Sequence, residues 1–390
     1  MDDREILELL RDMVRAPSHP GIERQEEAAA RVLDGFLRRR GVSSRLVEVR
    51  EGRPNVLAAV DGRRPGPHLL LCGHLDTVPP NEGATSDLFS AAIENGRMFG
   101  RGTVDMKGAL AAMAGALVMI EKGGGLPAGR VTLAAVIDEE MESLGAEALI
   151  RSGFKADGAV VGEPTGNRVA VGHKGLEWLE VVFTGRAAHG STPEAGVSAI
   201  AAAAHFAGLV ESELVPGYAR RRDAVLGLPA INLGTIRGGQ QPSMVAAQCR
   251  VQLDRRWVTT ETIDDVFAEL EALLAKVRSA RPGLETELKR MPGGMATMLH
   301  GPLVIARDHA LVKASLGAFE DAGRPAPPTT VFPAWTDGAL LSREAGIPTL
   351  IWGPGELALA HSAEESVAVE EVVLAARLYA AAARRFTGAP

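Results

Sequence analysis

Short apolar segments that alternate with helical patterns restrict the fold of this chain more than any other feature. Residues 69–72, 131–137 and 159–161 are almost wholly apolar, as expected of strands that are buried on both faces of a sheet. Helical patterns at residues 107–122 and 144–152 lie between them. Strands that alternate with helices predict an α/β fold, with a mixed, mostly parallel sheet covered by helices on both faces.

A second pattern interrupts the first between residues 174 and 291. Its order is strand 177–183, helix 198–213, strands 231–236 and 248–253, helix 260–278 and strand 285–289. This is the β-α-β-β-α-β order of a small split βαβ unit. The α/β pattern then resumes with helices 302–322 and 337–345, strand 349–352 and helix 369–386. We therefore expect residues 1–173 and 292–390 to form one domain, into which an α+β domain of residues 174–291 is inserted.

The composition indicates a globular chain without a nucleic-acid or membrane partner. The formal net charge is −7, from 42 basic and 49 acidic residues. This balance gives no support for the basic surface that binding to nucleic-acid phosphates requires. The longest apolar run, residues 109–120, is far shorter than the ~20 residues of a membrane-spanning helix. The charged N-terminus lacks the apolar core of a signal peptide, and the two cysteines form no C-x-x-C motif. We therefore expect a cytoplasmic protein.

Ionisable residues gather at the ends of the predicted strands. They are His74 and Asp76 after strand 69–72, Asp138, Glu139 and Glu140 after strand 131–137, Glu163 after strand 159–161, and His361 after strand 349–352. Asp105 lies just before helix 107–122. Open α/β sheets bind ligands beyond the carboxyl ends of their strands, so these side chains are expected to share one site.

Each of these residues, taken singly, also has a simpler interpretation. Asp105 could cap the helix that follows it, and the acids at 138–140 could form a solvated loop. The glycines around Asp105 do not match G-x-G-x-x-G, so a dinucleotide site is not indicated. Taken together, imidazoles and carboxylates without a thiolate suit two zinc-like ions. Two ions about 3.5–4 Å apart would polarise a carbonyl and activate a water, which leaves a spare carboxylate as general base.

The motifs that contain these residues resemble those of a known family. The chain looks like the co-catalytic zinc aminoacylases and exopeptidases, which include acetylornithine deacetylase, succinyl-diaminopimelate desuccinylase and glutamate carboxypeptidase. The matching stretches occur in the family's order, at residues 73–79, 100–108, 138–140, 161–165, 353–355 and 360–362. The inserted unit resembles the family's dimerisation domain. The resemblance therefore implies a zinc-exopeptidase-like catalytic domain in a homodimer.

The resemblance implies a role for each matching residue of the catalytic domain. His74 and Glu163 would bind one metal ion and Glu140 and His361 the other, while Asp105 would bridge both. Glu139 would be the general base that activates the water and later passes its proton to the leaving amine. Asp76 would orient His74 or tune Glu139.

The resemblance also implies roles for residues that would contact the substrate. His189 would reach across a dimer to stabilise the oxyanion, and Arg256 would bind a substrate carboxylate through its two-pronged guanidinium. Gly355, in the matching stretch 353–355, is a further substrate-binding candidate. Ser243, also a substrate-binding candidate, stands where the family often has asparagine. Trp335 is bulkier than the usual small residue, and either lines the substrate pocket or only packs.

These roles predict a metal-dependent hydrolase that cleaves the amide bond of an N-acyl amino acid. The alternative is an exopeptidase, either a carboxypeptidase or a dipeptidase, that acts on short peptides at the same site. A non-catalytic metal-binding dimer is disfavoured by the intact Glu139, and a serine hydrolase by the lack of a G-x-S-x-G elbow. The expected cofactors are two divalent ions, zinc first, with cobalt or manganese as alternatives because N and O ligands accept all three. The acyl group and the native metal do not follow from the sequence.

Overall fold

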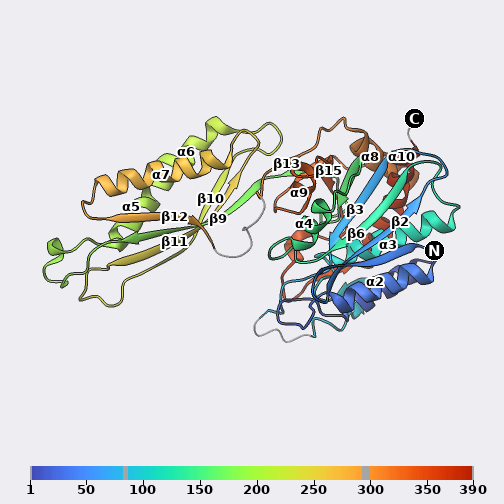
Figure 1. The fold of residues 1–390 in the computed structure, drawn as a ribbon, viewed down its shortest axis with the longest axis horizontal. Coiled ribbons are helices and arrows are strands. Elements are labelled where there is room, and N and C mark those ends of the chain that lie inside the picture. The colour runs from blue at the N-terminus through green and yellow to red at the C-terminus, as the bar shows by residue number, and fades with distance from the viewer. Residues whose placement is uncertain (1, 82–86, 292–298, 389–390) are drawn as a thin grey trace. The chain divides into compact units, whose positions relative to one another are not determined.

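The chain divides into two compact units (Figure 1). The first unit comprises Met1–His173 and Leu303–Pro390, and the inserted unit comprises Lys174–Pro302. The structure is a computed structural model that describes residues 2–81, 87–291 and 299–388. The expected domain boundary at residue 292 lies outside the described residues.

A mixed sheet forms the centre of the first unit. Its strands are β1 (Ser43–Arg50), β2 (Arg53–Asp61), β3 (His68–His74), β6 (Arg130–Val136), β7 (Gly158–Val161), β8 (Ala170–His173), β13 (Leu303–Val304), β14 (Thr330–Phe332) and β15 (Thr349–Ile351). Within the described residues their order is β1-β2-β6-β3-β7-β15-β8-β13, with β14 paired to β8. The central pairs β6–β3, β3–β7 and β7–β15 are parallel, whereas β1–β2, β2–β6 and β8–β13 are antiparallel. The predicted mixed α/β sheet is confirmed, with its parallel strands at the centre.

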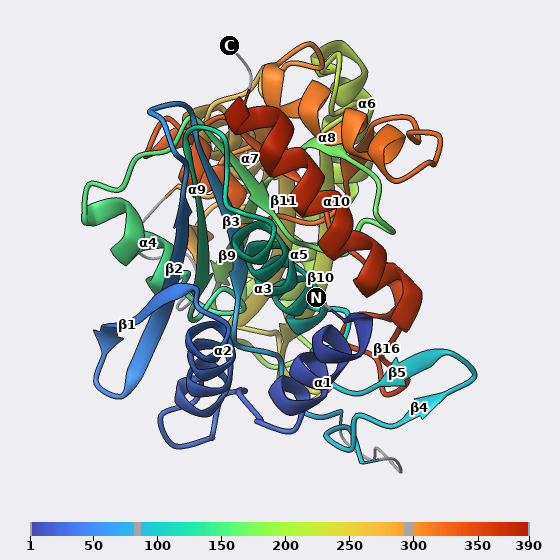
Figure 2. The same cartoon turned by 90° about the vertical axis from the view of Figure 1, so that its right-hand side faces the viewer.

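Helices cover both faces of this sheet, as predicted. They are α1 (Asp3–Val14), α2 (Glu27–Arg39), α3 (Lys107–Lys122), α4 (Leu144–Arg151), α8 (Ala310–Asp321), α9 (Gly338–Arg343) and α10 (Val369–Gly388), with a 3-10 turn at Leu357–Leu359. Helices α3 and α10 lie side by side and contact β3 (Figure 2). On the other face, α4 and α9 pack through Leu149 and Leu341 against Leu70 and Cys72 of β3. Burial on both faces explains why β3 is apolar without alternation.

A small three-stranded sheet lies beside these layers, in the same unit. It consists of β4 (Ile93–Glu94), β5 (Arg97–Phe99) and β16 (Ser366–Ala368), in the order β16-β5-β4. Both neighbouring pairs are antiparallel. The pairing of β16 with β5 brings the segment after His361 next to the segment before Asp105.

The inserted unit is a four-stranded antiparallel sheet with helices packed on one face. Its strands are β9 (Gly175–Thr184), β10 (Ala230–Gly238), β11 (Gln248–Trp257) and β12 (Glu285–Arg290), in the order β10-β11-β9-β12. Its helices are α5 (Ala199–Leu209), α6 (Val215–Gly217) and α7 (Ile263–Ser279), with a π-helical turn at Val210–Leu214 and 3-10 turns at Pro193–Ala195 and Tyr218–Arg221. The predicted β-α-β-β-α-β order is therefore present.

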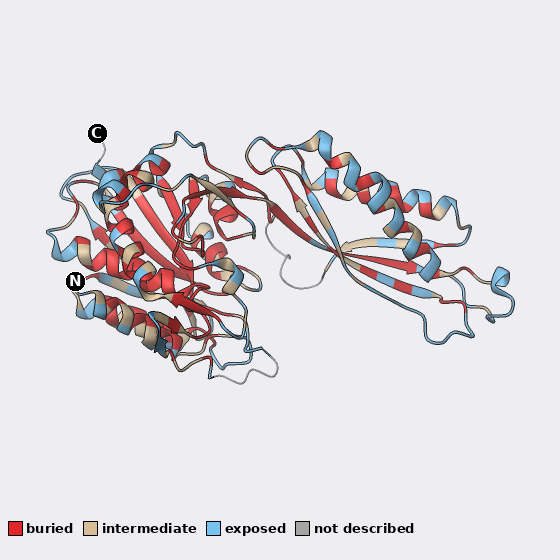
Figure 3. Cartoon of the chain, turned by 180° about the vertical axis from the view of Figure 1, so that it is seen from behind, coloured by how far each residue is buried: buried red, intermediate tan, exposed pale blue. Residues whose placement is uncertain are grey.

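The two faces of this inserted sheet differ in burial. Leu179, Val181 and Phe183 of β9 pack with Phe206 of α5 and Leu270 of α7 in one core. The helices of the inserted unit bury the side that faces the sheet and expose the other (Figure 3). Strand residues that alternate with the core positions face the opposite side, which we call the open face.

Two predicted helices end or begin elsewhere in the structure. The prediction of one helix over residues 302–322 is wrong, because Leu303–Val304 pairs with β8 as strand β13 and α8 begins only at Ala310. His309 caps that helix, since its side chain accepts a hydrogen bond from the Leu311 amide at 3.2 Å. The helix predicted over residues 198–213 continues as a π-helical turn from Val210. In the part of the chain that the structure describes, no helix is long and apolar enough to cross a membrane.

Candidate metal centre

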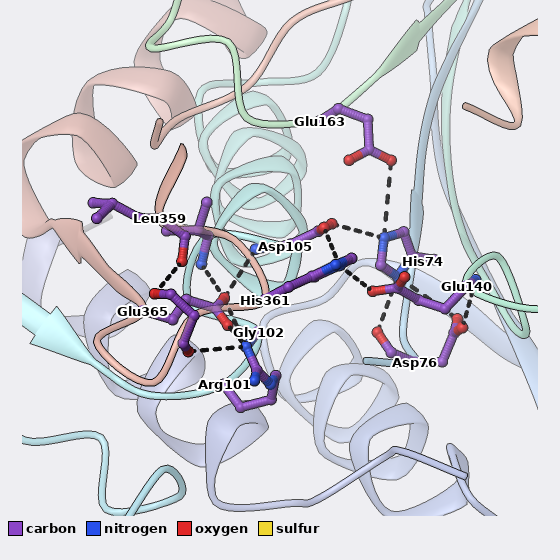
Figure 4. A network of polar contacts seen from close by, with 12 residues as sticks. His74, Asp76, Arg101, Gly102, Asp105, Glu140, Glu163, Leu359, His361 and Glu365 are labelled. Carbon is purple, nitrogen blue, oxygen red and sulfur yellow. Dashed lines mark hydrogen bonds and ion pairs between the residues drawn. The ribbon is translucent and has the colours of Figure 1, made fainter. Parts of the chain in front are cut away.

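The five predicted metal ligands come from loops at one edge of the central sheet. His74 is the last residue of β3, Glu140 follows β6, and Glu163 lies two residues beyond β7. Asp105 precedes α3, and His361 follows the 3-10 turn at Leu357–Leu359. Strands β6, β3 and β7 run parallel, so their carboxyl ends meet at the same edge. The structure thus brings all five side chains into one cluster (Figure 4).

Asp105 lies at the centre of this cluster, between the two histidines. Its Oδ1 is 3.0 Å from Nε2 of His74, and its Oδ2 is 3.1 Å from Nε2 of His361. Glu140 Oε1 lies 3.1 Å from the same nitrogen of His361, and Glu163 Oε1 lies 3.8 Å from that of His74. One carboxylate therefore faces two imidazoles, each of which has a second carboxylate beside it (Figure 4).

The donor set fits divalent cations. Ligand atoms of His74, Asp105 and Glu140 all lie within 4.8 Å of one another. Imidazole nitrogen and carboxylate oxygen, without a thiolate, are ligands that zinc, cobalt and manganese accept. His74 Nδ1 lies 2.9 Å from the backbone oxygen of Asp76, to which it donates. This bond leaves Nε2 as the nitrogen that faces Asp105 and can bind a metal ion.

The electrostatics of the cluster also favour a cation. Burial raises the pKa values of Glu139 and Glu163 well above their ordinary range. Burial, together with the charge of Asp105, raises the pKa of Glu140. Hydrogen bonds to Asp105 and Glu140 raise the pKa of His361 to about 10. Several carboxylates thus lie close together and repel one another, with the imidazoles named above as the positive charges beside them. A metal ion would relieve this repulsion.

Asp105 itself has a pKa below its ordinary value. Burial acts to raise the pKa of this carboxyl, but the hydrogen bonds from His361 and His74 outweigh burial. A carboxylate that stays ionised between two imidazoles has the properties of a bridging ligand.

Asp76 holds the loop that carries the two glutamates. Its carboxylate accepts hydrogen bonds from the backbone amides of Glu139 at 3.2 Å and Glu140 at 3.0 Å. Its side chain is fully buried, and its Oδ1 is 3.6 Å from Nδ1 of His74. Asp76 therefore contacts both His74 and the glutamate loop.

The third acid of the 138–140 stretch points to a different partner. Asp138 Oδ1 lies 2.6 Å from an Nη atom of Arg53, which also pairs with Glu26 at 2.5 Å. Arg53 thus neutralises Asp138 and leaves Glu139 and Glu140 for the cluster.

Glu365 and Arg101 form a buried pair that the sequence analysis did not identify as functional. Arg101 Nη1 lies 2.5 Å from Glu365 Oε2. The other oxygen of Glu365 accepts hydrogen bonds from the backbone amides of Gly102, Val104 and Asp105, at 2.9, 3.0 and 3.2 Å. This pair fixes the backbone that presents Asp105. The signal for it was weak, because Glu365 stands beside another glutamate in a loop.

Two predicted substrate residues lie close together in the inserted unit. The backbone oxygen of Ser243 accepts the amide of Gly190 at 2.7 Å, next to His189. His189 is exposed, and its Nδ1 accepts the amide of Ser191 at 3.2 Å. Because Nδ1 accepts this hydrogen bond, Nε2 is the ring nitrogen that can donate one.

Arg256, Gly355 and Trp335 occupy three separate environments. Arg256, on β11, pairs with Asp254 at 2.7 Å. Gly355, in the first unit, is buried with φ +89°, and its amide donates to Glu371 at 2.8 Å. Trp335, also in the first unit, packs edge-to-face on His173 and against the core of Phe332.

Comparison with known proteins agrees with this geometry. The model of the peptidase family M20/M25/M40 matches residues 70–385. Acetylornithine deacetylase of Proteus mirabilis is 30% identical over 380 residues, which cover 93% of this chain and 91% of that protein. The crystal structure of aminopeptidase PepT from Bacillus cereus has a TM-score of 0.79, with 22% identity and 99% of each chain covered. The Bacillus subtilis YXEP protein, described as a dinuclear metal binding peptidase, has a TM-score of 0.71, with 16% identity and 98% of each chain covered.

The two solved structures show the fold, and the family model and the deacetylase show the relationship. The family inferred from the motifs is thereby confirmed. Because the match extends over most of the sequence, this chain belongs to the peptidase family M20/M25/M40 and is a metal-dependent hydrolase of amide bonds.

Proposed function

We propose that this hydrolase removes the acyl group from an N-acyl amino acid. The observation that carries the proposal is Asp105, whose two oxygens face the imidazoles of His74 and His361 at 3.0 and 3.1 Å. This arrangement supports two adjacent ligand sets that would share one carboxylate. Two such sets are the arrangement that hydrolysis of an amide by a pair of ions requires.

The ligand sets would hold two divalent ions. His74 and Glu163 would bind one, Glu140 and His361 the other, and Asp105 both. Zinc is the first candidate, with cobalt and manganese as alternatives, because all three accept imidazole and carboxylate ligands. When bound, a pair of such ions lowers the pKa of a water and polarises the amide carbonyl.

Glu139 would move the proton in this reaction. Its carboxylate would accept the proton of the attacking water and deliver it to the nitrogen of the leaving amine. Burial raises the pKa of the Glu139 carboxyl, which makes its carboxylate a stronger base for the first of these steps. Asp76 would keep Glu139 in place through the hydrogen bond that its carboxylate accepts from the Glu139 amide at 3.2 Å.

His189 would stabilise the negative oxygen that develops on the substrate carbonyl. The amide of Ser191 donates to its Nδ1 at 3.2 Å, so Nε2 is the ring nitrogen that would donate to this oxygen. We propose that His189 acts at the site of the partner subunit in a homodimer. Strand β10 supports this assembly, since it is the edge of its sheet among the described residues and exposes Ile236, and Ile200 of α5 is also exposed.

The substrate would carry a free carboxylate beside its amide. Arg256 is the proposed receptor, because a guanidinium binds both oxygens of a carboxylate. We favour deacylation over peptide cleavage because the acetylornithine deacetylase is more similar in sequence, at 30% identity, than the aminopeptidase, at 22%. A cytoplasmic location accords with Cys72 and Cys249, which are both free.

The test measures the hydrolysis of N-acetyl, N-formyl and N-succinyl amino acids and of dipeptides, first with protein from which metal has been stripped. Zn²⁺, Co²⁺ and Mn²⁺ are then added back separately. We expect activity to return with metal and to favour one acyl group over the dipeptides. Preferential cleavage of dipeptides would replace the proposed function with the exopeptidase. Two bound ions per chain without any turnover would reject both.

A further inference from the structure

The guanidinium of Arg256 is bound along one of its two polar edges by the residue two positions before it. Arg256 Nε lies 2.7 Å from Oδ1 of Asp254, and Nη2 lies 2.9 Å from Oδ2. Both side chains are about a quarter exposed, at 27% and 26%. The pair is therefore bidentate and side-on, at a surface that solvent reaches.

Asp254 is itself held by the neighbouring strand. Trp178 of β9 lies directly opposite Asp254 of β11 in the antiparallel register, and its indole Nε1 donates to Asp254 Oδ2 at 3.1 Å. Trp178 is 43% exposed and alternates with the core residue Leu179, so all three side chains lie on the open face. The order of contacts is Trp178 to Asp254 to Arg256.

The backbone of Arg256 is fixed from the other face of the sheet. Arg255 is fully buried and donates to the backbone oxygen of Arg256 at 2.5 Å. It is tied in turn to Glu261 at 2.6 Å and Glu269 at 2.7 Å. Both the main chain and one edge of the Arg256 side chain are thus restrained.

This geometry leaves the second edge of the guanidinium available. Asp254 uses Nε and one hydrogen of Nη2, and within the described residues Nη1 has no hydrogen-bond partner. An arginine has five donors, so the Nη1/Nη2 edge can still bind a carboxylate end-on. The surroundings are positive, since burial and then the charges of Arg256 and Arg255 lower the pKa of Lys174.

We propose that Asp254 is a positioning residue for substrate recognition. It clamps Arg256 side-on, with Trp178 as its support, and so presents the Nη1/Nη2 edge to the carboxylate of the substrate. The inference rests on the proposed function, in which Arg256 is the carboxylate receptor. It adds the residues that keep this receptor ordered before the substrate arrives, which lowers the entropy lost on binding.

The test compares Asp254→Asn and Trp178→Phe with wild-type enzyme on two substrates. One is the best N-acyl amino acid of the panel, and the other is the same compound with its carboxylate converted to a primary amide. Trp178→Phe keeps the ring and every charge but removes the hydrogen bond to Asp254. Glu287→Gln is the matched charge control, because Glu287 is an exposed acid of the same sheet that pairs with Lys289 at 3.2 Å.

Asp254→Asn and Trp178→Phe should each raise KM for the carboxylate substrate and leave kcat within about twofold. We expect roughly a three- to tenfold rise for Asp254→Asn, the order of the cost of immobilising one free side chain. Trp178→Phe should give a smaller rise, and Glu287→Gln none. The kcat/KM for the amide should not change, because that substrate has no carboxylate. In an Arg256→Ala background, Asp254→Asn should add nothing further.

Three results would overturn the inference. An unchanged KM in both variants would show that Asp254 positions nothing. A lower KM in Asp254→Asn would make Asp254 a competitor of the substrate carboxylate instead of a support for its receptor. An equal loss on both substrates, with a lower melting temperature, would make the contacts structural only. Failure of the proposed function is distinct, because then Arg256→Ala itself would leave KM for the carboxylate substrate unchanged.

Discussion

At the scale of single residues, two adjacent glutamates are expected to do different work. Glu139→Gln should retain metal but lose about 10²- to 10⁴-fold in kcat, because an amide cannot accept the proton of the water. Glu140→Gln should instead lose metal, because Glu140 is a proposed ligand whose Oε1 lies 3.1 Å from Nε2 of His361. Metal content by atomic emission and kcat at saturating metal check both variants. A Glu139→Gln enzyme with full metal and near-normal kcat would remove Glu139 from the role of base.

The residue types of the site could be predicted because strand ends are readable in sequence. His74, Glu140 and Glu163 each follow an apolar strand, and parallel strands bring such ends together. The partner of Asp138 could not be predicted, since Arg53 lies 85 positions away and belongs to no motif. The pair of Arg101 and Glu365 was missed because the two residues are 264 positions apart, although Arg101 lies in the matching stretch 100–108.

At the scale of elements, the loop before α3 is expected to depend on Glu365. This side chain is 1% exposed and forms an ion pair with Arg101. It also accepts hydrogen bonds from three backbone amides within residues 102–105. Glu365→Gln leaves Arg101 buried without its counter-charge, which costs on the order of 3–5 kcal/mol of unfolding free energy. Metal affinity should fall as well, because Asp105 is no longer held. Urea unfolding and titration of metal-stripped protein measure both effects.

The control for that prediction is the neighbouring residue. Glu364 is exposed, so Glu364→Gln makes the same change of charge without touching the loop backbone. We expect its unfolding free energy to stay within about 0.5 kcal/mol of wild type. Equal losses in the two variants would mean that net charge near the site, and not the Glu365 contacts, sets stability.

Elements were predictable where they are long and their burial is uniform. Helix α3 is buried almost all round, and its sequence is apolar all round, so pattern and structure agree. The helix predicted from residue 302 was wrong because the apolar residues Leu303 and Val304 have two possible partners, a helix face or a strand edge. Pairing with β8 is a long-range contact that no local period reveals.

At the scale of the whole molecule, the residues proposed to act on the substrate come from both units. The proposed metal ligands belong to the first unit, whereas His189 and Arg256 belong to the inserted unit. Local patterns in the sequence identify these residues. They do not indicate whether a site is completed by the inserted unit of its own chain or by that of a partner subunit. A closed twofold dimer would let each chain complete the site of the other.

Heterodimers test this exchange directly. One chain carries His189→Ala and the other Glu139→Gln, with different affinity tags so that only the mixed dimer is purified. If His189 acts in the partner's site, the chain with His189→Ala keeps its own base and receives an intact histidine. The mixed dimer should then show about half of wild-type kcat, while both parent homodimers stay nearly inactive. A mixed dimer as inactive as its parents would mean that His189 serves its own chain, and a monomer in sedimentation would reject the shared site altogether.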